Sequence, residues 1–338
     1  MLHYYDEVSR QPQEVSRLLS HPHGLALDPA RPIRFVGIGT SLHACRVAEH
    51  WVRRISKDRA DVRAEEAHYF ALHTPISSDS QIVVVSHRGT KTFPNQVLEK
   101  GRSVGATRIS ITAESETVPS ADAVLRTCTA DRAATHTVSY TTALTVLAQL
   151  VSNTFESAAE HLDAALNQVP DAMSRAINAV PSEDAVSRAC RADRLLCVGF
   201  GIDAITADEA ALKLKEGTYK WADSLTTEFA LHGPPASYDA SLHAFILEPS
   251  EEDAGRTATL KSVLTKIGAT FTTIGVETAH ADHPDIIIPP CDPLARPLVA
   301  VVPLQLTVGA MADALGTNPD SIRTDTDPWA HAMTSYQL

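Results

Sequence analysis

Cysteine is scarce in this 338-residue sequence, and its distribution argues against a stapled or zinc-bound fold. The five cysteines are scattered without a C-x-x-C pair, and their odd number argues against a disulfide framework or a zinc ribbon. The fifteen histidines show no zinc-site context, and the one close pair, His21 and His23, lies in a proline-rich loop. We therefore expect a reduced, cytoplasmic protein with no metal and no other cofactor.

Basic charge is also in short supply. The chain carries 29 lysines and arginines against 41 acidic residues, a formal net charge of −12. Nucleic-acid binding needs a basic surface, so nucleic acid is not an expected partner. We find no apolar run long enough to cross a membrane and no signal-peptide layout at the N-terminus. An anionic small molecule stays possible, because helix N-termini and a few local cations set the field inside a cleft.

A glycine turn near the start of the chain is the most informative stretch. An apolar, strand-like run stops at Gly37 and Gly39, and Thr40 and Ser41 then open a helical pattern. Backbone N–H groups and the positive end of the helix dipole would face whatever lies above the strand. The hydroxyls can cap the helix, bind an anion, or do both. Dinucleotide binding is disfavoured, since Leu42 stands where G-x-G-x-x-G requires its third glycine.

Strand-like apolar runs alternate with helical patterns along the rest of the chain, which is typical of parallel sheets covered on both faces. Residues 194–201 repeat the strand and the Gly-x-Gly turn, so we expect two tandem three-layer α/β units. The strand-like runs lie at residues 33–37, 82–86, 108–112, 123–127, 194–199, 242–247, 270–274 and 285–288. The predicted divisions are an N-terminal helix and loop (1–24), a first domain (25–165), a linker helix (166–190), a second domain (191–316) and a tail (317–338) that covers the site.

The loop after the second strand is a candidate phosphate cradle. It places the hydroxyls of Ser86 and Thr90 and the cations Arg88 and Lys91 beside a glycine at a helix start. The alternative is a polar turn with ordinary capping. Ligands of open α/β sheets bind beyond the carboxyl ends of the strands, where this loop would lie.

A third loop, residues 135–142, is unusually rich in hydroxyls ahead of an apolar helix and includes Ser139 and Tyr140. Thr135, His136 and Thr137 are its polar residues nearest the helix start. They could complete the wall of a sugar site or simply cap the helix, and the sequence does not choose between the two.

A row of charges marks the second half of the chain. Glu209, Lys213, Glu216 and Lys220 recur at spacings of three and four, so they share one helix face. Spacing alone favours a solvated row of salt bridges. His232 follows on a glycine-containing loop, and a glutamate and a histidine near a phosphate cradle would suit proton transfer beside a sugar carbonyl.

Taken together, these motifs resemble the sugar isomerase (SIS) domain family, in particular the isomerase half of glucosamine-6-phosphate synthase and standalone sugar-phosphate isomerases and deaminases. The turn at Gly37 to Ser41, the 86–91 loop and residues 140–147 are similar to the first domain of that half. Residues 209–216, 232–234 and 302–306 are similar to its second domain. The resemblance covers roughly residues 25–325 in the right order.

The resemblance implies two tandem flavodoxin-like SIS domains, each a parallel sheet with helices on both faces. It implies that Glu216 moves a proton between C1 and C2 of a sugar phosphate, with Lys213 beside the reacting oxygens. His232 would assist ring opening from the neighbouring subunit, which implies a homodimer. The positions that would bind sugar or phosphate are Gly39, Thr40, Ser41, Ser86, Arg88, Thr90, Lys91, Thr135, His136 and Thr137.

The chain also departs from the family pattern. The usual S-Q-S-G-E-T loop is here Ser86-His-Arg-Gly-Thr-Lys91, so Arg88 replaces a phosphate-binding serine and Lys91 replaces a threonine. Two added cations still favour an anion, and a sulfonate or carboxylate group becomes possible. The tail has no lysine to match the one that relatives use with the open-chain carbonyl, which puts Schiff-base chemistry in doubt. The sequence shows no glutaminase domain, so glutamine is not the expected nitrogen donor.

The sequence therefore predicts an aldose–ketose isomerase of a phosphosugar, or a deaminase of an aminosugar phosphate, working by C1–C2 proton transfer. The alternatives are a non-catalytic, sugar-phosphate-binding regulator and an isomerase of another anionic sugar, such as a sulfonated one. The expected partners are an anionic sugar and a second copy of the chain, with no nucleic acid and no membrane.

Overall fold

The computed structural model describes residues 2–277 and 283–336, and these fall into two compact units. The N-terminal unit comprises residues 10–131, 136–168 and 326–336. The C-terminal unit comprises residues 2–9, 132–135 and 169–325 within the described part of the chain. Each unit is built on one sheet, and each is described separately below.

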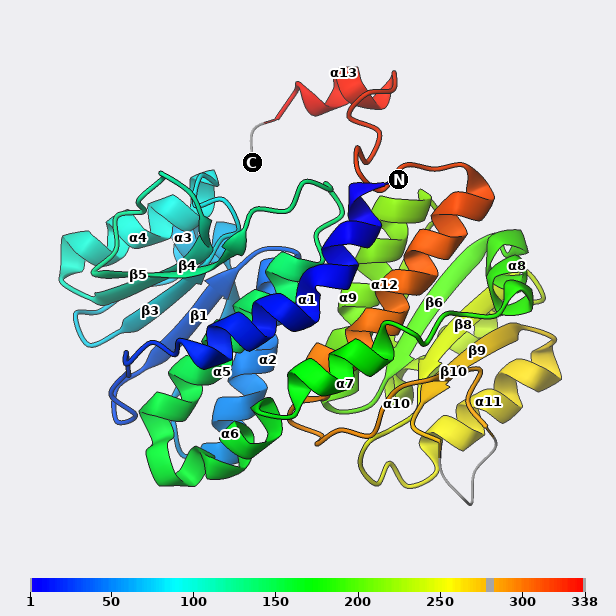
Figure 1. The fold of residues 1–338 in the computed structure, drawn as a ribbon, viewed down its shortest axis with the longest axis horizontal. Helices are drawn as coiled ribbons and strands as arrows, with labels where there is room; N and C mark the ends of the chain where they lie inside the picture. Colours follow the sequence, from blue (N-terminus) through cyan, green and yellow to red (C-terminus); the bar gives the residue numbers. More distant parts are fainter. Residues whose placement is uncertain (1, 278–282, 337–338) are drawn as a thin grey trace. The chain divides into compact units, whose positions relative to one another are not determined.

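The N-terminal unit is a five-stranded parallel sheet with helices on both faces (Figure 1). Its strands run in the order β2 (Val62–Glu66), β1 (Ile33–Gly37), β3 (Gln81–Val85), β4 (Thr107–Glu114) and β5 (Ala123–Thr129). One face is covered by α3 (Ala67–His73) and α4 (Thr92–Val104), which pack on the apolar residues of β1 and β3. The other carries α2 (Thr40–Ser56) and α5 (Val138–Phe155), which pack on each other.

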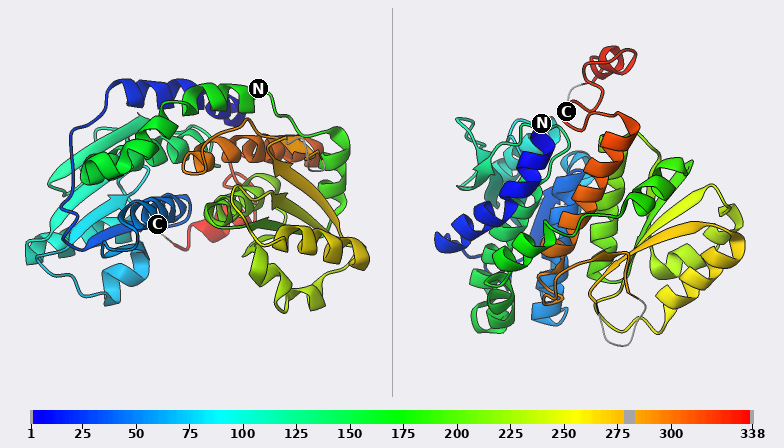
Figure 2. Two further views of the ribbon diagram at one scale, coloured as in Figure 1. Left: turned by 90° about the horizontal axis from the view of Figure 1, so that it is seen from below. Right: turned by 45° about the vertical axis from the view of Figure 1, so that its right-hand side comes forward.

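The C-terminal unit repeats this arrangement with its strands in the equivalent order (Figure 1, Figure 2). They are β7 (Ala222–Thr226), β6 (Arg194–Gly199), β8 (Leu242–Leu247), β9 (Thr270–Gly275) and β10 (Ile286–Ile287), all parallel. Helices α10 (Thr227–Leu231) and α11 (Arg256–Ile267) pack on the apolar face of β6 and β8. Helices α9 (Ile202–Thr218) and α12 (Arg296–Leu315) pack together, and the repeated α/β fold predicted from the sequence is confirmed.

Shorter elements complete the chain. Helix α1 runs from His3 to Ser20, and within the N-terminal unit its Gln11 side chain accepts a hydrogen bond from Thr141 of α5 at 3.0 Å. The segment expected as one linker helix contains two, α7 and α8, and Ser182 caps the second by accepting from the Ala185 N–H at 3.2 Å. The other short elements are α6 (Glu160–Leu166), α7 (Val169–Ala176), α8 (Glu183–Arg191), α13 (Trp329–Met333) and the 3₁₀ turns η1 (Glu156–Ala159) and η2 (Pro234–Ser237).

The sequence pattern did not predict two of the strands, β2 and β7. These two strands occupy equivalent positions in the two sheets. β2 and β7 each lie at one edge of their sheet, paired only with β1 and β6. Their central residues are partly solvent-exposed and include Arg63, Glu65 and Asp223. Edge strands are short and charged because one side of their backbone faces away from the sheet. Neither strand therefore shows the apolar run by which the buried strands were found.

Helix α12 corrects the expectation that no apolar run could cross a membrane. An 18-residue stretch of this 20-residue helix has a mean hydropathy of 1.7, which is long and apolar enough by length and composition alone. However, 78% of that stretch is buried, and the helix packs against α7, α8 and α9. A core helix enclosed on all sides is apolar all round for the same reason as a membrane span.

A buried histidine lies in the sheet of the C-terminal unit. His243 of β8 is fully buried, and its ring nitrogens lie 2.8 Å from the Thr270 hydroxyl and 3.1 Å from the Thr272 hydroxyl on β9. Burial lowers the pKa of His243 to about 4, helped by the charge of Arg188 and opposed by that of Asp285. The folded protein therefore holds this imidazole neutral.

This histidine predicts that the protein loses stability in mild acid. Between its folded pKa of about 4 and its unfolded value near 6.5, the unfolded chain binds the extra proton, so stability is complete above about pH 6.5 and falls as the pH drops toward 4. The loss reaches roughly 3 kcal/mol for this one group. Urea unfolding at pH 7.5 and pH 4.5 should show a smaller pH effect in His243→Gln than in the wild type. The exposed-site control His73→Gln should behave like the wild type, and equal pH effects in all three proteins would contradict the assignment.

Candidate functional site

The turn after β1 places two predicted site residues at the carboxyl end of the sheet. A Cβ on Gly37 would lie 2.6 Å from the backbone carbonyl carbon of Ser41, so only glycine allows the helix to begin so close to the strand. Gly39 has a φ of 56° and caps α2 without a side-chain hydrogen bond. Thr40 and Ser41 therefore form the first turn of α2, directly above the strand end.

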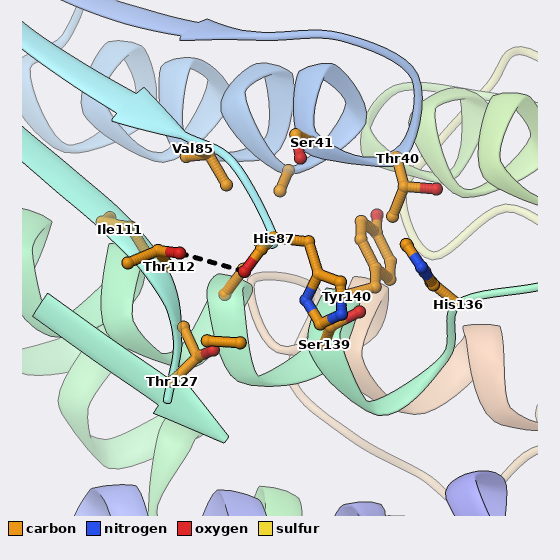
Figure 3. A pocket seen from close by; sticks show the side chains of 13 residues that line it. Thr40, Ser41, Val85, His87, Ile111, Thr112, Thr127, His136, Ser139 and Tyr140 are labelled. Atoms are coloured by element: carbon orange, nitrogen blue, oxygen red, sulfur yellow. Dashed lines mark hydrogen bonds between the residues drawn. The ribbon is translucent and has the colours of Figure 1, made fainter. Parts of the chain in front are cut away.

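A small cavity opens at this place, wholly within the N-terminal unit (Figure 3). Its walls come from the first turns of α2 and α5 and from the carboxyl ends of β3, β4 and β5, where open parallel sheets bind ligands. No aspartate or glutamate is among the described residues that line it. The main polar side chains on its walls are Thr40, Ser41, His87, His136, Ser139 and Tyr140.

The residue of the 86–91 loop that lines the cavity is not one of those predicted from the sequence. His87 lines the cavity, whereas Arg88 and Thr90 are solvent-exposed and Lys91 is half-buried. The Ser86 hydroxyl is buried and has no hydrogen-bond partner among the described residues. Burial lowers the pKa of Lys91, and the charge of Arg88 lowers it further. The predicted cradle residues of this loop thus lie beside the cavity wall rather than in it.

His87 could have been found from the sequence. Side chains alternate along a strand, so the residue two positions beyond the inward-facing Val85 continues the same face. The sequence-based prediction instead favoured Arg88 and Lys91, whose charges suit an anion but which do not line the cavity. Ser139 and Tyr140 belong to the hydroxyl-rich stretch 135–142 that the sequence offered as a possible wall, and both line the cavity. Thr112 and Thr127 were missed as lining residues, because nothing in their local sequence distinguishes the wall of a cavity from a packed core.

Asp131 fixes the loop that precedes α5. Its buried carboxylate accepts hydrogen bonds from the N–H groups of Thr137 and Ser139 at 2.7 and 3.2 Å, which satisfies the N-terminus of the helix. His136 lines the cavity, with its ring centroid 4.4 Å from that of His87. Thr137 is buried outside the lining, and Thr135 belongs to the C-terminal unit, where its N–H donates to the carbonyl of Pro319.

In the C-terminal unit, the charged row on α9 is buried rather than solvated. Glu209 and Lys213 are 0% and 2% exposed, and only Glu216 keeps a substantial exposed fraction, 25%. The Lys213 Nζ lies 2.6 Å from Glu216 Oε2 and 3.7 Å from Glu209 Oε1. The interpretation drawn from spacing alone is therefore wrong, because α12 packs against α9. Lys220 lies beyond the end of α9 and is not part of this row, and its Nζ donates a hydrogen bond to the carbonyl of Cys190.

A tyrosine from the start of the chain belongs to the same unit and lies within the electrostatic influence of this row. The buried Tyr4 hydroxyl donates to the carbonyl of Gln305 on α12 at 2.9 Å. Burial raises the pKa of Tyr4, and the neighbouring Tyr5 and the carboxylates of Glu216 and Glu209 add to the rise. The row is thus enclosed by protein on several sides, with Glu216 at its accessible end.

His232 stands apart from the charged row within the C-terminal unit. It is exposed at the end of α10, followed by Gly233 with a φ of 107°. Within the described residues, its imidazole makes no hydrogen bond to Glu216 or Lys213. The structure of one chain therefore does not bring these two predicted catalytic groups together, and the action of His232 in a neighbouring subunit stays a prediction.

The C-terminal unit contains a copy of the glycine turn. In this copy, the position that matches Ser41 is occupied by a buried, charged side chain. Gly201 adopts φ 58° and ψ −126°, almost the values of Gly39, 56° and −131°. The residue that matches Ser41 is Asp203, fully buried and 2.7 Å from the guanidinium Nε of Arg296. Arg296 also donates to the carbonyl of Glu248. Burial raises the pKa of Asp203, although the charge and hydrogen bond of Arg296 oppose the rise.

This ion pair predicts a large stability cost when one partner is removed. Asp203→Ala leaves the Arg296 guanidinium buried without its counter-charge, and we expect a loss of about 3–5 kcal/mol in the free energy of unfolding, measured with urea. Glu228→Ala breaks the exposed pair with Arg256 in the same unit and should cost less than about 1 kcal/mol. The double variant Asp203→Leu with Arg296→Met should recover most of the loss. Equal costs for the two single variants would contradict a buried, paired role.

Fold and site together define a class: an open α/β protein with a polar cavity beyond the strand ends of its first sheet. Comparison with known families makes this specific. Residues 26–153 match the SIS domain family, and this part of the chain is an SIS domain, as the resemblance predicted.

Curated and solved relatives extend the likeness. Glutamine–fructose-6-phosphate aminotransferase (isomerizing) of Thermococcus kodakarensis is 26% identical over 306 residues, which is 86% of this chain and 50% of that protein. The chain thus spans about half the length of the curated relatives that it matches.

Two solved structures share the fold across both units. The C-terminal domain of glucosamine-fructose-6-phosphate aminotransferase from Francisella tularensis superposes with a TM-score of 0.81 at 20% identity, covering 95% of this chain and 98% of that one. Glucosamine-6-phosphate deaminase from Thermotoga maritima gives a TM-score of 0.78 at 19% identity, covering 94% and 97%. At these identities the likeness establishes the fold.

Proposed function

We propose that the protein acts on a phosphorylated or otherwise anionic sugar, as an aldose–ketose isomerase or as an aminosugar-phosphate deaminase. The observation that carries the proposal is the buried Glu209–Lys213–Glu216 row on α9, with Lys213 held 2.6 Å from a carboxylate that remains 25% exposed. Buried charges of this kind cost stability and are concentrated at functional sites. Its SIS domain and its relatives among aminotransferases and deaminases support the same class.

In the proposed reaction Glu216 is the base. Its accessible carboxylate takes a proton from C2 or C1 of the open-chain sugar and returns it to the neighbouring carbon, through an enediol or enolamine. Lys213 stabilises the negative charge that develops on the sugar oxygens, because a fixed ammonium in a dry site needs no reorganisation. His232 would open the sugar ring from the neighbouring subunit of a homodimer.

Anion binding is assigned to the N-terminal unit. Thr40, Ser41 and His136 line its cavity, and Gly39 shapes the turn that carries the first two. The 86–91 loop adds the Ser86 hydroxyl, the cations Arg88 and Lys91, and Thr90 beside it. Neither cation makes an ion pair within the described part of the chain, so both are available to a phosphate, sulfonate or carboxylate. We place the protein in the cytoplasm, where sugar phosphates are found.

Isotope exchange tests the role of Glu216. With fructose 6-phosphate or glucosamine 6-phosphate in deuterated water, wild-type protein should exchange the C1 or C2 proton, measured by NMR. Glu216→Gln should slow this exchange by about 100-fold or more, because the amide cannot accept the proton. Glu228→Gln, at an exposed position of α10 in the same unit, is the matched control and should exchange at the wild-type rate. Unchanged exchange in Glu216→Gln would remove it from this role.

A non-catalytic sugar-phosphate binder is the second candidate. The observation that favours it is the tail after residue 317, which contains no lysine to engage an open-chain carbonyl. A binder would be stabilised by sugar phosphates in a thermal melt, with no proton exchange in the wild type. The buried charged row argues for the enzyme, because a binding protein gains nothing from a general base.

A further inference from the structure

Helix α9 is closed by Tyr219, three residues after Glu216, and this tyrosine has an unfavourable backbone conformation. It is the C-cap residue, with a φ of 60°, in the left-handed region where glycine is the usual residue at a helix end. A residue with a side chain spends free energy to adopt this conformation, so the contacts of the Tyr219 side chain have to offset that cost.

Those contacts come from residues 317–323, which follow α12 and which we call the tail segment. The Tyr219 hydroxyl donates a hydrogen bond to the Asn318 carbonyl at 2.9 Å and accepts one from the Asn318 N–H at 3.3 Å. The guanidinium carbon of Arg323 lies 4.3 Å from the centroid of the Tyr219 ring, a cation–π contact. Ile322 and Arg323 have positive φ values themselves, 45° and 62°, which is rare for a β-branched residue. The tail segment thus holds Tyr219 at both its hydroxyl and its ring face.

The backbone next to Glu216 is enclosed as well. The Thr317 hydroxyl donates to the Gly217 carbonyl at 2.7 Å, and this is one of the terminal carbonyls that have no partner within the helix. A Cβ on Gly217 would lie 2.4 Å from Val308 Cγ1 on α12 and 3.6 Å from Pro319 Cβ. Only glycine allows so close an approach, and α12 and the tail segment together fix the chain immediately after Glu216.

Asp320 anchors the tail segment to two other stretches of the C-terminal unit. Its carboxylate accepts hydrogen bonds from the His3 and Tyr4 N–H groups at 2.8 and 2.9 Å, so it satisfies the start of α1, which lies beside the chain that follows α12 (Figure 1). Its carbonyl accepts a hydrogen bond from the Ala134 N–H at 3.0 Å. The tail segment is therefore held in place independently of its contacts with Tyr219.

We propose that Tyr219 is a positioning residue for Glu216: the tail segment holds Tyr219 so that the end of α9 keeps the Glu216 carboxylate against Lys213, 2.6 Å away. The inference rests on the proposed function, in which Glu216 is the base. A displacement of about 1 Å can cost on the order of 100-fold in rate, so proton transfer depends on a helix end that does not move. The tail, which contains no lysine, thus contributes to the reaction through the position of the base.

The first test observes the Lys213 ammonium and needs no activity. In wild-type protein labelled with ¹⁵N-lysine, proton–nitrogen correlation in mildly acidic buffer should show a slowly exchanging ammonium signal, because Lys213 is 2% exposed and bonded to Glu216. Lys213→Arg keeps the charge and assigns the signal by its loss. In Tyr219→Phe, which lacks only the hydroxyl that binds the tail segment, the signal should shift and broaden.

Two further variants make this test specific. Tyr238→Phe removes a hydroxyl that donates to the Ala230 carbonyl at 2.9 Å in the same unit, and as the matched control it should leave the Lys213 signal unchanged. Arg323→Gln removes the cation from the Tyr219 ring and should alter the signal as Tyr219→Phe does. Arg323→Lys restores a cation and should return the signal toward that of the wild type.

The second test is kinetic and uses fructose 6-phosphate in deuterated water. Tyr219→Phe should lower kcat for exchange of the sugar proton by roughly tenfold, while KM changes by less than about twofold, because the base is displaced and the groups that bind the sugar are not. A raised KM with a wild-type kcat would contradict a positioning role.

The outcomes separate this inference from the proposed function. A Lys213 signal that is equal in Tyr219→Phe and the wild type, or no slowly exchanging signal in the wild type, would overturn the inference even if the wild type exchanges the sugar proton. An altered signal in Tyr219→Phe with no sugar-proton exchange in the wild type would uphold the hold of Tyr219 on the Glu216–Lys213 contact and reject the enzyme. In an active enzyme, a wild-type kcat in Tyr219→Phe would overturn the inference.

Discussion

The arrangement of both units depends on one close backbone contact, between a strand-ending glycine and the helix that follows it. At Gly37 a side chain would meet Ser41, and at Gly199 a Cβ would lie 2.3 Å from the carbonyl oxygen of Asp203. Because no larger residue fits, each helix begins directly above the carboxyl end of its strand. The residue four positions after the glycine is thereby fixed at the place where open α/β sheets bind ligands.

Two turns of nearly identical backbone geometry thus have different surroundings in the two units. Ser41 is small and neutral, and the space beside it is an open cavity. Asp203 brings a carboxylate to the equivalent position, where it binds Arg296 and fills the space from within. Nearly the same backbone turn therefore faces a cavity in the N-terminal unit and a buried ion pair in the C-terminal unit. The duplicated fold therefore leaves an open strand-end site in its N-terminal unit.

Much of the fold could be predicted, because buried strands and glycine turns leave a direct trace in the sequence. The edge strands β2 and β7 leave none, since their exposed residues are polar. Spacing showed that Glu209, Lys213 and Glu216 share a helix face, but it could not show that α12 packs against this helix. Burial is decided by residues about a hundred positions away, and local periodicity carries no information about them. The loop after β3 was located correctly, yet its inward side chain, His87, was passed over for its exposed cations.

The buried row on α9 is better explained by chemistry than by stability. Removing an ammonium from water costs several kcal/mol, and an apolar side chain of similar size at position 213 would avoid that cost at little risk to the fold. Lys213 is nevertheless enclosed, with carboxylates at 2.6 and 3.7 Å to offset the cost. Those carboxylates differ in one respect: Glu209 is sealed and Glu216 is not. Lys213 and Glu209 hold the buried end of the row in place, while the Glu216 carboxylate remains accessible to solvent. Such a carboxylate can exchange a proton with a ligand that binds and dissociates. That asymmetry, rather than the presence of charge alone, supports assigning the chemistry to Glu216.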